Sequence, residues 1–151
     1  MARTQASGDT ALATTPAIRL GVHLKQAQHL LRQRMDERLR PLGLNAGLWS
    51  VLHEMVRAPG ASSAELARSA FQTPQTVGGL IKRLTQLGLV ERHQAHGRVV
   101  ENHLTEHGNL VYQQATEDID TLINSVLVDL TATNRNRLDT LLVSLVATLG
   151  G

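Results

Sequence analysis

The chain has 151 residues, a formal net charge of +2 and no cysteine, which excludes disulfides, thiolate nucleophiles and cysteine-ligated zinc. Its length suits a single domain, and its scarcity of aromatic residues (one Trp, one Tyr, one Phe) favours a helical core of aliphatic side chains over a β-sandwich. Residues 1–15 contain no apolar run of the kind that a signal peptide needs, and no uncharged stretch approaches the length of a membrane span. We therefore expect a cytoplasmic protein.

Charge is divided unevenly along the chain. Residues 1–60 carry eight Lys or Arg against four Asp or Glu, and residues 61–100 carry five against two. Residues 101–151 reverse the balance, with two Arg against seven acids. A basic centre with an acidic tail is typical of a protein whose middle faces phosphate, although ordinary solvated surface charge would give the same pattern.

The first 44 residues predict an arm followed by one long helix. Residues 1–15 are rich in Ala, Thr, Ser and Gly without periodicity, which is typical of a disordered arm. From about residue 16 to residue 39, apolar side chains recur on one helical stripe, formed by Leu20, Leu24, Ala27, Leu31 and Met35. Pro41 and Gly43 are expected to end this helix.

Residues 45–104 predict a helix, a helix-turn-helix and a two-stranded ribbon. Asn45 is a good N-cap for a second helix, which should end before Pro59. Ser62 and Glu65 form a capping box, which predicts the start of a short third helix.

The fourth helix and the ribbon follow directly. Thr73 is the expected N-cap of a helix that has Pro74 at its first position and Gly88 just past its end. Residues 89–93 and 98–104 then alternate like short strands, with residues 95–97 as the turn between them.

Two further helices are expected in residues 105–151. Thr105 should cap a fifth helix that reaches Leu130, and Thr131 should cap a sixth. The apolar stripes of the first and last helices have no evident core to face within one chain. We therefore expect residues 16–44 and 105–151 to be dimerisation helices in a homodimer, with a four-helix monomer as the alternative.

The fourth helix has two chemically different faces. One face is apolar and consists of Val77, Leu80, Ile81, Leu84 and Leu87. The other collects hydrogen-bonding and basic groups, namely Gln75, Thr76, Gly79, Lys82, Arg83 and Gln86. A helix that reads DNA must bury one flank and present such groups on the other, and Gln pairs well with adenine. An ordinary surface helix with a polar outer face is the alternative.

The ribbon supplies a second basic element. Arg92, His93, His96 and Arg98 lie on or beside its glycine turn. An Arg at a ribbon tip suits the narrow minor groove, where negative potential is concentrated. Following a capped helix-turn-helix, this ribbon favours the DNA-binding interpretation over a plain surface helix.

The segment ELARSAFQTPQTVGGLIKRLTQLGLVER (residues 65–92) resembles the core of the MarR family, with LA, TV and GLV-x-R at the family's spacing. RVVENHLTEHG (residues 98–108) is similar to the family's wing strand and its LT-x-x-G motif. The resemblance extends over about residues 17–149. It implies a mainly α fold with a small β-wing, in which a winged helix-turn-helix is flanked by N- and C-terminal dimerisation helices. It also implies a homodimeric bacterial transcriptional regulator, usually a repressor that a small ligand releases.

Two departures from the family pattern bear on DNA contact. The family wing commonly reads Asp-x-Arg, whereas this chain has His96-Gly97-Arg98, so the resemblance carries over the minor-groove arginine as Arg98 without the acid that braces it. Gly78 and Gly79 stand where relatives often have larger polar residues. Either Gly79 lets the helix backbone approach the bases closely, or a base contact has been lost.

The expected DNA contacts combine helix caps, the polar face of the fourth helix and the ribbon, with double-stranded DNA carrying an inverted-repeat operator as the partner. They are Ser62, Thr73, Gln75, Thr76, Gly79, Lys82, Arg83, Arg92, His96 and Arg98.

The resemblance also implies an effector cleft between the DNA-binding part and the dimerisation helices. We expect His23, Trp49 and His53 to bind a small, aromatic carboxylate there. The alternative is that Trp49 is a core residue and that the histidines are partly exposed.

Other kinds of site are not supported by the sequence. The seven histidines make a zinc site worth considering, but no pair sits with acids at a recognisable ligand spacing, so we expect no metal. No Ser-His-acid signature, phosphate-binding glycine loop or paired-carboxylate motif appears, so we expect neither an enzyme nor a cofactor. A winged-helix module that binds protein, and a DNA-binding protein without ligand control, remain the alternatives.

Overall fold

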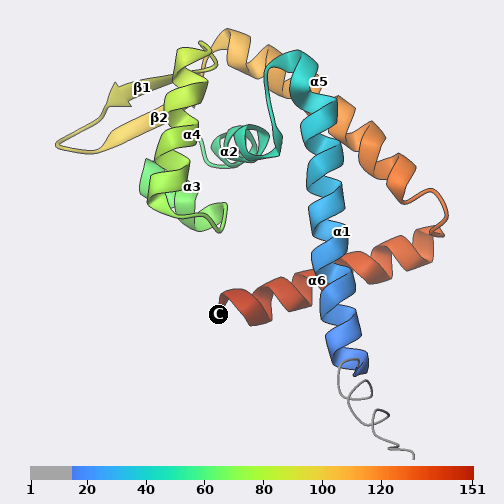
Figure 1. Ribbon diagram of the computed structural model, residues 1–151. Helices are drawn as coiled ribbons and strands as arrows, with labels where there is room; N and C mark the ends of the chain where they lie inside the picture. The colour runs from blue at the N-terminus through green and yellow to red at the C-terminus, as the bar shows by residue number, and fades with distance from the viewer. Residues whose placement is uncertain (1–14) are drawn as a thin grey trace, which may run out of the picture.

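The computed structural model describes residues 15–151; the predicted arm lies almost wholly outside this range. The described chain is mainly helical with one antiparallel two-stranded sheet, which confirms the expected fold class. Its elements are α1 (Pro16–Leu39), a 3₁₀ turn (Arg40–Leu42), α2 (Ala46–Arg57), α3 (Ser63–Ser69), α4 (Pro74–Gln86), β1 (Val90–Gln94), β2 (Val100–Leu104), α5 (Glu106–Val126) and α6 (Ala132–Gly150). Figure 1 shows α2, α3, α4 and the ribbon gathered on one side, with α1 and α5 extending away from them and α6 running back across α1 to end below α3.

Side-chain caps explain where the helices begin. Each of the six α-helices starts after a residue whose side-chain oxygen accepts a hydrogen bond from the backbone N–H three positions later, satisfying a donor that the helix itself leaves free. These caps are Thr15, Asn45, Ser62, Thr73, Thr105 and Thr131. Short polar residues immediately before apolar periodic segments are therefore sufficient to fix the helix starts.

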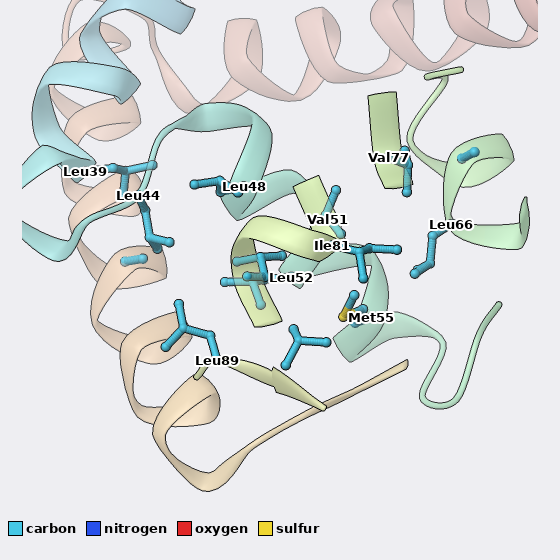
Figure 2. Packing of buried hydrophobic residues seen from close by; sticks show 14 of the residues in the cluster. Leu39, Leu44, Leu48, Val51, Leu52, Met55, Leu66, Val77, Ile81 and Leu89 are labelled. Atoms are coloured by element: carbon cyan, nitrogen blue, oxygen red, sulfur yellow. The ribbon is translucent and has the colours of Figure 1, made fainter. Parts of the chain in front are cut away.

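One aliphatic core holds the helix-turn-helix to its neighbours. The centre of this core is α2, which packs between α4 and the C-terminal end of α1 (Figure 2). The buried side chains include Leu39 of α1, Leu48, Val51, Leu52 and Met55 of α2, Leu66 of α3, Val77, Ile81 and Leu84 of α4, and Ala115 and Ile119 of α5. The absence of aromatic rings from this set agrees with the aliphatic core expected from composition.

A close contact joins the end of α4 to the start of α5. The Thr105 hydroxyl donates to the Gly88 carbonyl at 2.7 Å and accepts from the Gly108 N–H at 2.9 Å. A Cβ added at Gly108 would overlap the carbonyl oxygen of Leu89. The first turn of α5 therefore lies directly on the backbone that follows α4, and a glycine is required at this crossing.

The fifth helix is shorter than expected from the sequence. It ends at Val126, so that Leu130 lies beyond it in the connection to α6. The Arg135 guanidinium donates to the carbonyls of Leu127 and Leu130 at 2.8 and 3.1 Å. These hydrogen bonds satisfy carbonyl groups in the connection between α5 and α6.

Apolar side chains remain exposed on α6 and on most of α1. α6 has no buried residue, and Leu39 is the one buried residue of α1. The exposed apolar residues of these two helices include Ile18, Leu20, Val22, Leu24 and Leu30 on α1 and Leu141, Val143, Leu145, Val146 and Leu149 on α6. Within residues 15–151, no helix combines the length and the apolar character needed to cross a bilayer.

The ribbon differs from expectation in its turn. The strands pair in register from Val90↔Leu104 to Gln94↔Val100, and the Ala95 N–H donates to the Val99 carbonyl at 2.9 Å. The turn therefore covers residues 95–99 rather than 95–97, with Gly97 at φ +78°. Arg98, which the alternation placed in a strand, lies in this turn.

We predict that Gly108→Ala destabilises the protein, because the added methyl group would overlap the backbone carbonyl of Leu89. Overpacking of this kind costs about 1–3 kcal/mol in the free energy of unfolding, measurable by urea denaturation. Gly78→Ala is the matched control: Gly78 is an exposed helical glycine with no heavy atom within 4 Å of an added Cβ, and the change should stabilise α4 by about 1 kcal/mol. Equal stability of the Gly108→Ala variant and the parent would contradict the crossing described above.

Candidate nucleic-acid interface

α4 buries one face and presents the other to solvent. Val77, Ile81 and Leu84 are buried, and Leu80 and Leu87 are partly buried and pack against the same core, so that the five residues form the predicted apolar face. The expected contact residues on this helix and its cap are exposed, namely Thr73, Gln75, Thr76, Gly79, Lys82 and Arg83. The structure thus brings all six to one accessible surface.

The first turn of α4 is held by its cap. The Thr73 hydroxyl oxygen accepts from the Thr76 N–H at 3.1 Å and lies 2.8 Å from the Thr76 hydroxyl. The Thr76 side chain is therefore oriented by the cap, while the neighbouring Gln75 is exposed. This arrangement leaves Gln75 free to donate and accept at an approaching ligand.

Ser62 already uses its hydroxyl proton. Its hydroxyl donates to Glu65 Oε2 at 2.8 Å and accepts from the Glu65 N–H at 3.3 Å, and the Ser62 N–H donates to the same carboxylate at 2.7 Å. These bonds from the Ser62 backbone and hydroxyl lower the pKa of the Glu65 carboxyl, with a smaller contribution from Arg68. A phosphate at Ser62 would have to replace an ionised carboxylate as the acceptor, which makes Ser62 the weakest of the expected contacts.

A hollow between α3 and the wing brings two arginines to the same surface. Its volume is about 460 Å³, and its lining includes Arg68 of α3 and Arg98 of the wing turn. Arg92 and His96 are also exposed on the wing. Arg68 is not among the contacts predicted from the sequence, because one basic residue near the end of a short helix carries no signal of its own. Placed beside Arg98, it adds positive charge where the wing approaches a ligand.

Asn102 ties the wing to the helix-turn-helix. It is the directly paired residue of Arg92 across the ribbon, and its side chain is fully buried. Its Nδ2 donates to the Ala61 carbonyl at 2.9 Å, in the loop between α2 and α3. The sequence does not indicate this hydrogen bond, because Ala61 lies 41 positions before Asn102. The contact fixes where the wing stands relative to α3.

The other face of the ribbon pairs histidines with acids. His93 Nε2 lies 3.1 Å from Glu91 Oε1, and His103 Nε2 lies 3.0 Å from Glu101 Oε2. The two imidazole rings are 5.6 Å apart. In the described part of the chain, no group of three or more His, Cys, Asp or Glu residues is arranged to hold a metal ion. The carboxylates make this face a poorer match for phosphate than the face that carries Arg92.

Trp49 and His53 form a stacked pair between α2 and α5. Their ring centroids are 4.9 Å apart with an interplanar angle of 18°. His53 Nδ1 lies 2.9 Å from the Tyr112 hydroxyl, and the Trp49 indole N–H donates to the Thr116 hydroxyl at 3.1 Å. Both predicted ligand residues are thus partly buried, with polar atoms that already have partners on α5.

His23 does not join this pair within one chain. It is exposed on α1, 12 residues before Met35, the point at which α1 packs on the core. That separation is about 18 Å along a helix axis, at about 1.5 Å per residue. The structure therefore brings together two of the three predicted ligand residues and leaves the third on the exposed part of α1.

A small cavity that the sequence did not indicate lies between α1, α2 and α4. Its volume is about 100 Å³. It is lined by Arg32, Asn45, Gly47, Ser50, Val51, Ala70, Gln72, Thr76 and Leu80. A cation from α1 and several neutral polar groups thus line the same cavity as Thr76, one of the expected DNA contacts on α4.

Comparison with known proteins identifies the family. The family model of the MarR family matches residues 42–99. Over 115 residues, the chain is 34% identical to the HTH-type transcriptional repressor Rv2887 of Mycobacterium tuberculosis (strain ATCC 25618 / H37Rv), which covers 75% of this chain and 83% of that protein.

Solved structures agree in fold. A crystal structure of the Mycobacterium tuberculosis MarR family protein Rv2887 with p-aminosalicylic acid has a TM-score of 0.70 and 32% identity, covering 83% of this chain and 97% of that one. The organohalide-sensing regulator RdhR-CbdbA1625 has a TM-score of 0.85 at 19% identity, covering 99% of this chain and 90% of that one, a likeness of fold alone. From the sequence relationship to Rv2887 together with the family match, this chain belongs to the MarR family, a family of winged helix-turn-helix transcriptional regulators and not of enzymes.

Proposed function

We propose that the chain is a homodimeric, sequence-specific DNA-binding repressor that recognises an inverted-repeat operator and is released by a small aromatic acid. The observation that carries the proposal is the exposed polar face of α4 beside the basic wing turn. The relationship to Rv2887 supports it further, because that protein is named a repressor and has been crystallised with DNA. A protein-binding module is the alternative, and the two arginines that line the hollow between α3 and the wing favour DNA over it.

The exposed groups divide into two roles on DNA. Gln75 and Thr76, near the N-terminus of α4, would read base edges in the major groove, where Gln pairs with adenine and a Thr methyl group contacts thymine. Basic side chains would contact phosphate, and Arg98 in the wing turn would enter the minor groove. The proposed phosphate contacts are Lys82, Arg83, Arg92 and His96, and we add Arg68 because it lines the same hollow as Arg98.

The exposed apolar side chains of α1 and α6 support the homodimer. Contiguous apolar surface of this kind marks an interaction surface in soluble proteins. A two-fold axis through α1 and α6 would bury these stripes against their copies and place two α4 helices on one side of a duplex, with half-sites about 10 bp apart.

Two substitutions separate the proposed roles. Arg98→Ala should weaken binding to all sequences by a similar factor and lower the slope of affinity against salt by about one, because it removes a backbone or groove contact. Gln75→Ala should lose about 1–3 kcal/mol of discrimination at one base pair of each half-site. Selection from a random DNA pool, followed by gel shifts at several salt concentrations, measures both effects.

The opposite results would overturn the assignment. Full DNA affinity of the Arg98→Ala variant would show that Arg98 of the wing turn does not contact DNA. An unchanged selection profile for Gln75→Ala removes direct reading by that residue. If the parent protein shows no steep dependence on salt, the chain is a protein-binding module instead.

A comparison of two neighbouring glycines tests the close approach of α4 to the bases. Both Gly78 and Gly79 are exposed helical residues with open space around an added Cβ, so either change to Ala should stabilise the fold about equally. If Gly79 lets the backbone approach the bases, Gly79→Ala should reduce operator affinity while Gly78→Ala does not. Equal affinity of the two variants in a gel shift would instead favour a lost base contact at Gly79.

For the effector, we favour the cavity at Arg32. Crystal structures of Rv2887 contain salicylic acid and p-aminosalicylic acid, both aromatic carboxylates. Arg32 supplies a counter-charge for such a carboxylate, and the shared wall with Thr76 connects the cavity to the DNA-reading helix. At about 100 Å³ the cavity is smaller than the usual ligand pocket of about 300–1,000 Å³, so that binding must move α4 relative to α1. The stacked pair Trp49 and His53, with His23, is the competing site.

Release of DNA by salicylate should distinguish the two sites. Arg32→Gln should abolish release while leaving operator affinity unchanged, and His53→Ala should retain release. Trp49 is the one tryptophan of the chain, so that its fluorescence reports ligand at the stacked pair directly. Loss of release in His53→Ala, together with quenched Trp49 fluorescence, would move the effector to that pair. No release from the parent protein by any aromatic acid would favour ligand-independent DNA binding.

A further inference from the structure

Phe71 adopts a left-handed backbone conformation in the turn between α3 and α4. Its φ is +53°, and it is the one non-glycine residue with positive φ in the described range 15–151. The Phe71 N–H donates to the Arg68 carbonyl at 3.2 Å, and the Gln72 N–H donates to the Ala67 carbonyl at 3.0 Å. This pair of hydrogen bonds is a Schellman motif, which satisfies the last carbonyls of α3.

The same motif ends α4 with a glycine. There the Gly88 N–H donates to the Thr85 carbonyl, the Leu89 N–H donates to the Leu84 carbonyl, and Gly88 has φ +73°. Glycine adopts this conformation without steric cost, whereas a side chain at Cβ opposes it. The backbone of the α3–α4 turn would therefore be served better by glycine. A left-handed conformation at a non-glycine residue is uncommon and often marks a functional position, so the contacts of the Phe71 side chain are of interest.

The Phe71 side chain is 73% exposed, and one edge of its ring contacts the far end of α6. A Cβ added at Gly150 would lie 3.2 Å from Phe71 Cε1, and Phe71, Val146, Leu149 and Gly150 line one apolar hollow of about 230 Å³. Figure 1 shows the end of α6, marked C, below the turn that joins α3 to α4. α6 has no buried residue. The contact with Phe71 nevertheless joins its C-terminal end directly to the winged helix-turn-helix.

We propose that Phe71 is a positioning residue that holds the turn before α4 against the end of α6 and so sets the angle between these two helices. The N-cap of α4, Thr73, follows Phe71 by two residues, so a displacement of the ring is transmitted to the first turn of α4. The consequence for DNA rests on the proposed function. If α6 joins two copies, its angle to α4 sets the distance between the two reading helices, and hence the operator spacing that the dimer accepts.

The Phe71→Gly variant removes the ring while keeping the backbone conformation of the turn, so it separates the effects of the two. Glycine keeps the Schellman motif and relieves its strain, so the variant should resist urea unfolding at least as well as the parent. Affinity for operators with the native spacing and with one base pair inserted or removed is then measured by gel shift. The parent should discriminate sharply between spacings, and Phe71→Gly should reduce that discrimination by about fivefold. Hydrogen exchange of residues 146–150, measured without DNA, should quicken in the variant.

Gly150→Ala provides the matching change on α6. Its added methyl group meets the ring, so it should alter spacing discrimination and exchange at residues 146–150 in the parent but not in the Phe71→Gly background. Additive effects of the two changes, or unchanged exchange and unchanged spacing discrimination in Phe71→Gly, would overturn the proposal. If the parent does not bind DNA, the proposed function fails, and the exchange measurements still decide whether the ring holds α6.

Discussion

The structure depends on a mismatch between where apolar side chains occur and where one chain can bury them. The core closes around α2 and takes in only the C-terminal end of α1, while Leu20 and Leu24 of α1 and Leu141 and Leu145 of α6 stay exposed. Burying apolar surface contributes about 25 cal/mol per Å², so two helices with exposed apolar stripes gain substantially from association. In the proposed homodimer, a second copy would supply an identical pair of stripes and would leave the polar face of α4 free.

Several short connections hold the winged helix-turn-helix together and join it to α1 and α5. The Asp36 carboxylate of α1 accepts from the Ala46 N–H of α2 at 2.8 Å, and Asn102 joins the wing to the α2–α3 loop. Gly108 and Thr105 press the start of α5 onto the end of α4. In the proposed control by an effector, a ligand in the Arg32 cavity that changed the angle between α1 and α4 would shift α4 and the wing together.

Local signals in the sequence are enough to predict the helices, but they do not predict the contacts between segments that are far apart in the sequence. Each predicted cap is a short polar residue that accepts a hydrogen bond from an N–H three positions later, so a cap can be recognised from neighbouring residues alone. The end of α5 was placed four residues too late, because Arg135, on the following helix, caps it. The predicted wing turn is too short, because period-two alternation does not show where the pairing between the two strands stops.

The candidate site shows the same division. The polar face of α4 follows from helical periodicity alone, and the structure exposes all of its predicted contacts. Pairing of Trp49 with His53 follows from their i, i+4 spacing, but their partners Tyr112 and Thr116 are about 60 residues away in sequence. The Arg32 cavity and the contact of Phe71 with α6 depend on helix crossing angles, which no local pattern records.

The central claim, that two copies of this chain present two α4 helices to one duplex, is tested most directly by sedimentation equilibrium of the protein alone and with operator DNA. The account predicts a protein mass of twice 16.4 kDa in the free protein and two chains on each inverted repeat. A 16.4 kDa particle that binds the repeat as a single chain, or that does not bind it, would contradict the account.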